Sequence, residues 1–188
     1  MKYIKHYVKW IELIVEVIFL IVLFLLGLFL EYELAASLFW QFYLFMAVLA
    51  LILLLPVYLQ SRHKQELWLF IGFNISLLTL HFLTLNPVKP FTKFYLDAKN
   101  GMTIQEVQSL FNQHFPQGGR FPQPEWALND EYNGGVWENR DLKEKGFVAI
   151  PDQNLNYILD PNNGDYNAEI VTVYFKDGKV VGAKYLPD

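Results

Sequence analysis

The chain has 188 residues, a net charge of −4, 53% hydrophobic residues and no cysteine. This composition excludes disulfides, thiolate metal sites and the clustered basic surface that nucleic-acid binding needs. Residues 1–86 are neutral overall and nearly continuous in apolar character, so the whole net charge falls on residues 87–188. We therefore expect a membrane-embedded first half and a water-soluble second half.

Three apolar runs fill the first half, at about residues 10–30, 38–59 and 67–85. Each approaches the roughly 20 apolar residues that a helix needs to cross a bilayer. A chain this short cannot wrap three such helices in protein, so residues 1–86 are predicted to form a three-helix transmembrane region. We interpret the first run as an uncleaved anchor because Glu31-Tyr32-Glu33 follow it; a signal peptide cleaved near Ala35-Ala36-Ser37 is the alternative.

The distribution of Lys and Arg in the short loops predicts the orientation. Three lysines precede the first run, and Arg62 and Lys64 lie between the second and third runs. The loop between the first and second runs has two Glu and no basic residue. This pattern predicts a multi-pass protein of the cell membrane, with a cytoplasmic N-terminus and an extracytoplasmic C-terminal domain. Lysines at positions 89, 93 and 99 oppose this assignment because they closely follow the third run.

Glu16 and Asn74 are polar residues inside predicted spans. Each follows a tryptophan, Trp10 or Trp68, by six residues, which places both about 9 Å deep by helix rise. Because a carboxylate in hydrocarbon is costly and usually finds a partner, we predict that Glu16 and Asn74 face each other. The alternatives are a Glu16 that snorkels toward Lys9, and a transport or proton-relay role; the sequence leaves the charge state of Glu16 open.

The third run carries the features expected of a helix–helix contact. Gly72 and Ser76 have the small-xxx-small spacing that lets another helix approach closely. His81 is interpreted as an interhelical hydrogen-bond partner. Together these residues make a homo-oligomer possible.

Residues 87–101 are interpreted as a membrane-proximal linker. Pro87 and Pro90 are expected to end the third helix. The side chains that follow are expected to lie on lipid headgroups: Phe91, Phe94, Tyr95, Leu96, Lys89 and Lys93.

The soluble domain, residues 102–188, carries two clear local signals. Thr103 and Glu106 form a capping box that predicts a helix over about 103–115. Asp177-Gly178 between two β-branched runs predicts a type I′ hairpin, in which Phe175 faces Val180 and Tyr174 faces Val181.

Further strands are expected at about 154–159 and, as a possible fourth piece, at 147–150. The stretch 121–139 is interpreted as a loop. Its aromatic residues are expected to cover the core or, alternatively, to form a partner surface: Trp126, Tyr132 and Trp137.

The segments 100–114 and 168–183 resemble the SmpA/OmlA-type (BLIP-like) periplasmic domains. They share a Gly-Met-Thr helix start followed by Glu-Val, and a Phe-x-Asp-Gly-Lys-Val hairpin. The resemblance implies a small α+β fold and an accessory role in outer-membrane protein assembly. This chain departs from the family in having three apolar runs in place of a lipidated N-terminal cysteine.

No catalytic or cofactor motif stands out, and we expect neither an enzyme nor a cofactor. The acidic stretch 160–169 has the wrong spacing for a calcium loop and is interpreted as a turn, although a bound cation stays possible. The fold class is thus a three-helix transmembrane region plus a small α+β domain. We expect an accessory or assembly subunit whose partners are membrane lipid and another membrane or extracytoplasmic protein. The alternative is a small transporter or channel subunit using Glu16 and the polar face of the third span.

Overall fold

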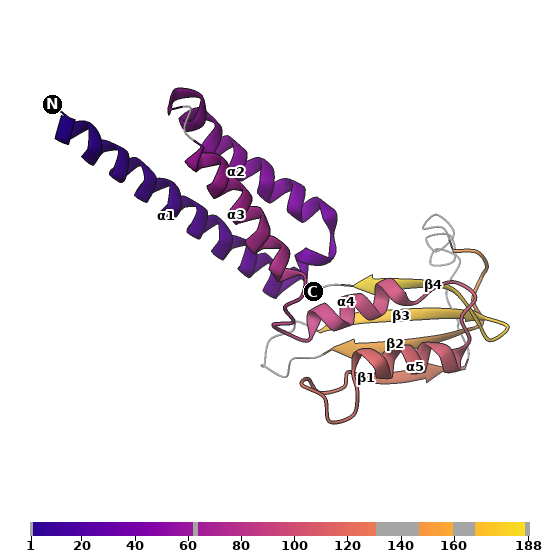
Figure 1. Ribbon diagram of the computed structural model, residues 1–188. Coiled ribbons are helices and arrows are strands. Elements are labelled where there is room, and N and C mark those ends of the chain that lie inside the picture. Colours follow the sequence, from indigo (N-terminus) through magenta and orange to yellow (C-terminus); the bar gives the residue numbers. More distant parts are fainter. Residues whose placement is uncertain (1, 62–63, 131–146, 160–167, 187–188) are drawn as a thin grey trace. The chain divides into compact units, whose positions relative to one another are not determined.

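The computed structural model describes residues 2–61, 64–130, 147–159 and 168–186. The chain divides into two compact units, Met1–Leu85 and Asn86–Asp188, whose elements are labelled in Figure 1. The elements described in the first unit are all helices, and the second unit is a small α+β fold, as the sequence predicted.

The helical unit contains four elements: α1 (Lys2–Leu34), the short 3-10 helix η1 (Ala36–Leu38), α2 (Trp40–Ser61) and α3 (Gln65–Leu80). Two stretches are long and apolar enough to cross a membrane, Trp10–Leu34 in α1 and Trp40–Leu59 in α2. The third helix ends at Leu80, five residues before the predicted end of its span. Its 16 residues cover about 24 Å, less than the roughly 30 Å of a hydrocarbon core.

Side chains of α2 and α3 lie close to Gly27 of α1. A Cβ atom built there would lie 3.1 Å from Met46 Cε of α2 and 3.3 Å from Leu77 Cδ2 of α3. Contacts this tight leave little room for a side chain at position 27, so a glycine lets Met46 and Leu77 pack against α1 there. Because one helix connects α1 and α3, these two run in the same direction, and Gly27 against Leu77 fixes their relative depth.

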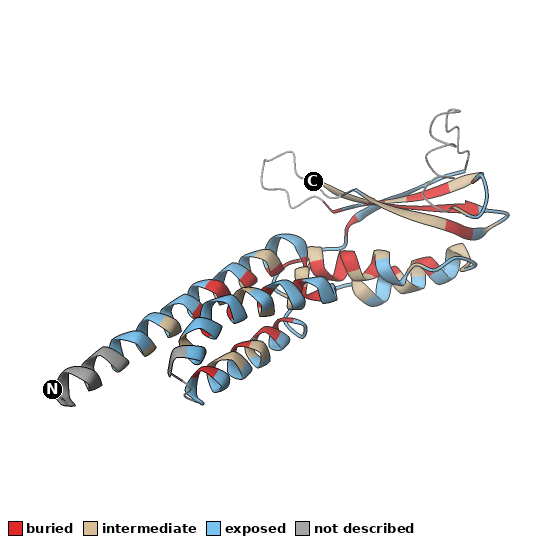
Figure 2. Ribbon diagram, turned by 90° about the horizontal axis from the view of Figure 1, so that it is seen from above, coloured by how far each residue is buried: buried red, intermediate tan, exposed pale blue. Residues whose placement is uncertain are grey.

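The second unit is a four-stranded antiparallel sheet covered by two helices on one face (Figures 1 and 2). The strand order is β1-β2-β3-β4. Its elements are α4 (Val88–Asp97), α5 (Ile104–His114), β1 (Glu125–Asn129), β2 (Gln153–Leu159), β3 (Glu169–Lys176) and β4 (Lys179–Leu186). The buried core between helices and sheet consists of Phe91, Phe94, Val107, Phe111, Phe115, Leu155, Tyr157, Leu159, Val171, Val173, Phe175 and Val180.

Residues 88–97, predicted as a linker on lipid headgroups, form the amphipathic helix α4 instead. Phe91 and Phe94 are fully buried, and the Phe94 ring lies 4.7 Å from that of Tyr157. Lys89 is also buried, at 1% exposure. The prediction was wrong because it treated Pro90 as a helix breaker. In the first turn of a helix the backbone N–H groups have no intrahelical acceptor, so a proline, which lacks an N–H, is tolerated there.

Helix α5 begins as the capping box predicts. The Thr103 backbone N–H donates to Glu106 Oε2 at 2.7 Å, and Thr103 Oγ1 accepts from the Glu106 N–H at 3.3 Å. The preceding residues join the start of β4, where the Gly101 N–H donates to the Val180 carbonyl and the Val180 N–H to the Met102 carbonyl, both at 2.8 Å. These contacts seat α5 against the sheet.

The hairpin between β3 and β4 has the predicted turn but a different register beyond it. Asp177 and Gly178 both have positive φ, 51° and 72°, as a type I′ turn requires. Phe175 pairs with Val180 as expected, whereas Tyr174 pairs with Gly182 rather than Val181 because of a β-bulge. The bulge turns Val181 toward Tyr174 and Phe147, with which it forms a second small cluster.

The fourth strand is β1, which lies in the stretch predicted to be a loop. Trp126 of β1 pairs with Tyr157 of β2. The predicted piece at 147–150 is not a strand. Its Phe147 ring lies over Gly182, where a Cβ atom would come within 2.4 Å of it, and the Val148 N–H donates to the Val181 carbonyl at 3.3 Å.

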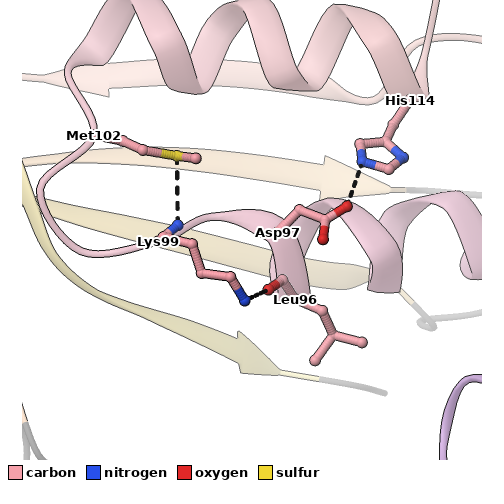
Figure 3. A network of polar contacts seen from close by, with 5 residues as sticks. All are labelled: Leu96, Asp97, Lys99, Met102 and His114. Atoms are coloured by element: carbon pink, nitrogen blue, oxygen red, sulfur yellow. Dashed lines mark hydrogen bonds and ion pairs between the residues drawn. The ribbon is translucent and has the colours of Figure 1, made fainter.

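His114, at the end of α5, contacts Asp97 at the end of α4 (Figure 3). The Nε2–Oδ2 distance is 3.1 Å, and the His114 side chain is 17% exposed. Burial lowers the pKa of His114 below its ordinary value, although the Asp97 carboxylate acts in the opposite direction. The folded unit therefore favours the neutral imidazole.

This lowered pKa predicts a loss of stability on acidification. The unfolded chain takes up the His114 proton at a higher pH than the folded chain, so stability falls as the pH drops below about 6.5. His114→Gln should flatten the dependence of Tm on pH between about 5 and 7.5, and Asp97→Asn should steepen it. Circular dichroism of the full chain in mild detergent measures both. A variant H114Q with the pH dependence of the wild type would contradict the assignment.

Candidate functional site

Four polar groups converge on Ser37 in η1, at the end of the helical unit where α1 turns into α2. The Ser37 backbone N–H donates to Glu31 Oε2 at 2.8 Å, and Ser37 Oγ donates to the Leu80 carbonyl at 3.3 Å. The Ser37 carbonyl accepts from Tyr43 Oη at 2.9 Å and lies 3.1 Å from His81 Nδ1. We call Glu31, Ser37, Tyr43 and His81 the Ser37 cluster.

The cluster joins all the helices of its unit through one residue. Glu31 belongs to the last turn of α1, Tyr43 to the first turn of α2, and His81 directly follows α3. Glu31 and Ser37 are each only 1% exposed. A buried carboxylate that accepts from a backbone N–H makes one of the stronger kinds of hydrogen bond, so the cluster fixes the α1–α2 turn against the end of α3.

Ser, His and Glu are also the residue types of a nucleophilic triad, but their geometry here serves packing. The Ser37 hydroxyl directs its proton to the Leu80 carbonyl, and His81 Nδ1 faces the Ser37 carbonyl, so His81 donates there. An activated serine would instead donate to the imidazole, which would be oriented by the carboxylate. The contacts of Glu31, Tyr43 and His81 are all made with the Ser37 backbone.

The backbone of this turn is unusual. Ala35 is fully buried and adopts a left-handed conformation with φ of 49°, and its N–H donates to the Glu31 carbonyl at 3.1 Å. Alanine rarely adopts this conformation because its Cβ crowds the following carbonyl. The cluster was missed in the sequence because Glu31 resembles an ordinary interfacial loop residue; its one signal is an acidic residue six positions before a serine in an otherwise apolar context.

Glu16 and Asn74, the predicted intramembrane pair, lie at different levels of the helical unit. Gly27 lies against Leu77, so Glu16, eleven residues before Gly27, is level with Glu66, eleven before Leu77. Asn74 is about 12 Å further along the axis, and its Nδ2 donates to the Phe70 carbonyl at 2.8 Å. Glu16 interacts electrostatically with Glu66 and Glu12. The prediction assumed that Trp10 and Trp68 lie at equal depth, which this register does not support.

Gly72 and Ser76, the predicted small-residue pair, line a groove between α1 and α3. A Cβ atom at Gly72 would have nothing within 4 Å, so this glycine is not where the described helices meet. The groove has a volume of about 330 Å³. Its wall on α1 consists of Val17, Leu20, Ile21 and Phe24.

Trp126 is the one member of the predicted partner surface that the structure describes. It is 51% exposed on β1, at the edge of the sheet, and Leu128 on the same face is 39% exposed. Tyr132 and Trp137, like most of the acidic stretch 160–169, lie outside the described residues.

Removing the Glu31 carboxylate should destabilise the helical unit. In Glu31→Ala the buried Ser37 N–H loses its acceptor, and an unsatisfied buried donor costs about 1–3 kcal/mol. The matched control is Glu33→Ala, which removes an exposed carboxylate from the same turn and should change stability by less than about 0.5 kcal/mol. Thermal unfolding in mild detergent compares the two, and equal effects would show that the Ser37 cluster does not fix the turn.

Comparison with known proteins adds no relative to these observations. No protein-family model, curated protein or solved structure matches the chain.

Proposed function

We propose that the chain is a multi-pass membrane protein of the cell membrane that presents an extracytoplasmic interaction module and serves as a non-catalytic accessory or assembly subunit. Its helical unit anchors it in the bilayer, and its α+β unit docks on another membrane or extracytoplasmic protein. The observation that carries the docking proposal is the exposed aromatic edge strand β1.

The outward faces of the helices support insertion in a bilayer. Ile18, Val22 and Phe29 of α1 are each more than half exposed, as are Leu44 and Ile52 of α2. Apolar surface in water is unfavourable by about 25 cal/mol per Å², and soluble proteins rarely leave such continuous patches uncovered. Hydrocarbon around the helices removes this cost.

We include α3 as a third span although the helix alone is short. The apolar sequence continues beyond Leu80 through Leu83 and Leu85. The backbone there turns, as the Leu83 N–H donates to the Leu80 carbonyl at 3.2 Å. A short span is accommodated by local thinning of the bilayer or by flanking polar residues. Three spans, with basic residues near the N-terminus and between α2 and α3, support an extracytoplasmic position of the α+β unit.

The α+β unit supports a docking role rather than a chemical one. Its helices and sheet enclose an aromatic core in which the Phe94, Phe111 and Tyr157 rings are in contact. Its exposed apolar side chains include Trp126 and Leu128 on an edge strand, where tryptophan is a frequent anchor of protein interfaces. Helix α5 and the β3–β4 hairpin are the segments that resemble the SmpA/OmlA-type domains, which supports an accessory role.

The topology predicts which part of the chain a protease can reach. In intact cells or sealed right-side-out vesicles, added protease should remove the α+β unit and leave the helical unit protected. An epitope placed after Met1 should become accessible only when the membrane is opened. Protection of the α+β unit in sealed vesicles, with loss only in opened ones, would invert the proposed orientation.

The docking proposal predicts position-specific cross-linking in the native membrane. A photo-reactive amino acid at Trp126 should give a discrete adduct larger than the chain. The same group at Val148, which is 70% exposed outside β1, should not. Trp126→Ala should reduce recovery of the adduct partner several-fold, whereas Val148→Ala should not change it. Equal adducts at both positions, or an adduct of twice the chain mass only, would count against docking on a different protein.

A further inference from the structure

The row of α3 residues that lines the groove between α1 and α3 is preceded, one turn earlier, by a cation. Trp68, Gly72 and Ser76 line the groove at intervals of four residues, which places them on one helical face. Lys64 lies one turn earlier on the same row and is exposed. From the start of the helix inward, the row thus consists of the cation Lys64, the indole ring of Trp68, and Gly72, which has no side chain and leaves a notch.

The groove is suited to an apolar occupant. Ser76 Oγ donates to the Phe73 carbonyl of its own helix at 2.7 Å, so its hydroxyl proton does not donate to an occupant of the groove. The wall formed by α1 is wholly aliphatic and aromatic. In a bilayer such a space is filled with hydrocarbon, because water there would lack polar partners.

The charge beside the groove favours a phospholipid over a helix of a second copy, because the exposed Lys64 one turn before the groove complements a phosphate.

We propose that this groove binds one phospholipid, with an acyl chain along Gly72 and the phosphate at Lys64. The inference rests on the proposed insertion of the helical unit in a membrane. Lys64 and Gly72 are separated by about 12 Å along the helix, which matches a headgroup cation above a buried chain. Trp68, 68% exposed, lies between them at the level where indole rings favour the interface. The Lys64 ammonium supplies the charge complementarity for the phosphate.

The test is lipid retention by the full chain, purified in mild detergent and examined by native mass spectrometry. The probes are dioleoyl phosphatidylglycerol and dioleoylglycerol, which carry the same chains with and without phosphate. The wild type should retain one phospholipid per chain. Gly72→Leu, which fills the notch, should reduce retention about tenfold. Lys64→Gln should lower phospholipid retention to the level of dioleoylglycerol.

Thr79→Leu is the control, because it places the same leucine side chain at an exposed position of α3 outside the groove, and it should retain lipid like the wild type. Ile21→Trp fills the groove from α1 and repeats the test if Gly72→Leu loses its helical circular dichroism signal. Equal retention by the groove-filling variants and Thr79→Leu would overturn the proposal. Lipid retention does not depend on the outcome of the cross-linking at Trp126 or of the protease experiment. Failure of the lipid proposal can therefore be told apart from failure of the docking or orientation proposals.

Discussion

A single buried carboxylate sets the geometry of the helical unit. In the bilayer that we propose as their surroundings, apolar helices would gain little from the hydrophobic effect when they associate, so packing and a few polar contacts would decide their arrangement. Here Glu31 accepts the Ser37 N–H, while the rest of Ser37 contacts Tyr43, His81 and the Leu80 carbonyl. This joins the three helices at one end. About one helical turn from this cluster, Met46 of α2 and Leu77 of α3 both lie close to Gly27 of α1.

These two points of contact also determine what the rest of the unit can do. With Gly27 against Leu77, the carboxylates Glu16 and Glu66 come to the same level, and Asn74 falls too far along the axis to meet either. The helices converge at Gly27, whereas no described atom lies near the position of a Cβ at Gly72. The groove between α1 and α3 therefore lies where the helices are not in close contact.

Features that depend on neighbouring residues in the chain were predictable. The capping box at Thr103 and the Asp177-Gly178 turn are chemical signals contained within a few residues, and the apolar runs of α1 and α2 need only a count. Features that depend on distant residues were not. The bulge that pairs Tyr174 with Gly182 involves Phe147, the placement of Pro90 in a first turn depends on where α4 begins, and the role of Glu31 depends on a turn at Ala35 that its residue type does not favour.

The aromatic ring over Gly182 offers a way to trace this α+β unit beyond the present chain. Since even one methyl group at position 182 would collide with Phe147, we expect homologous sequences that keep this ring to keep a glycine four residues after the Asp-Gly turn, 35 positions after the ring. Ordinary hairpins carry no such long-distance pairing of residue types. That pair is therefore a more discriminating search criterion than the helix cap or the turn, both of which occur in many unrelated folds.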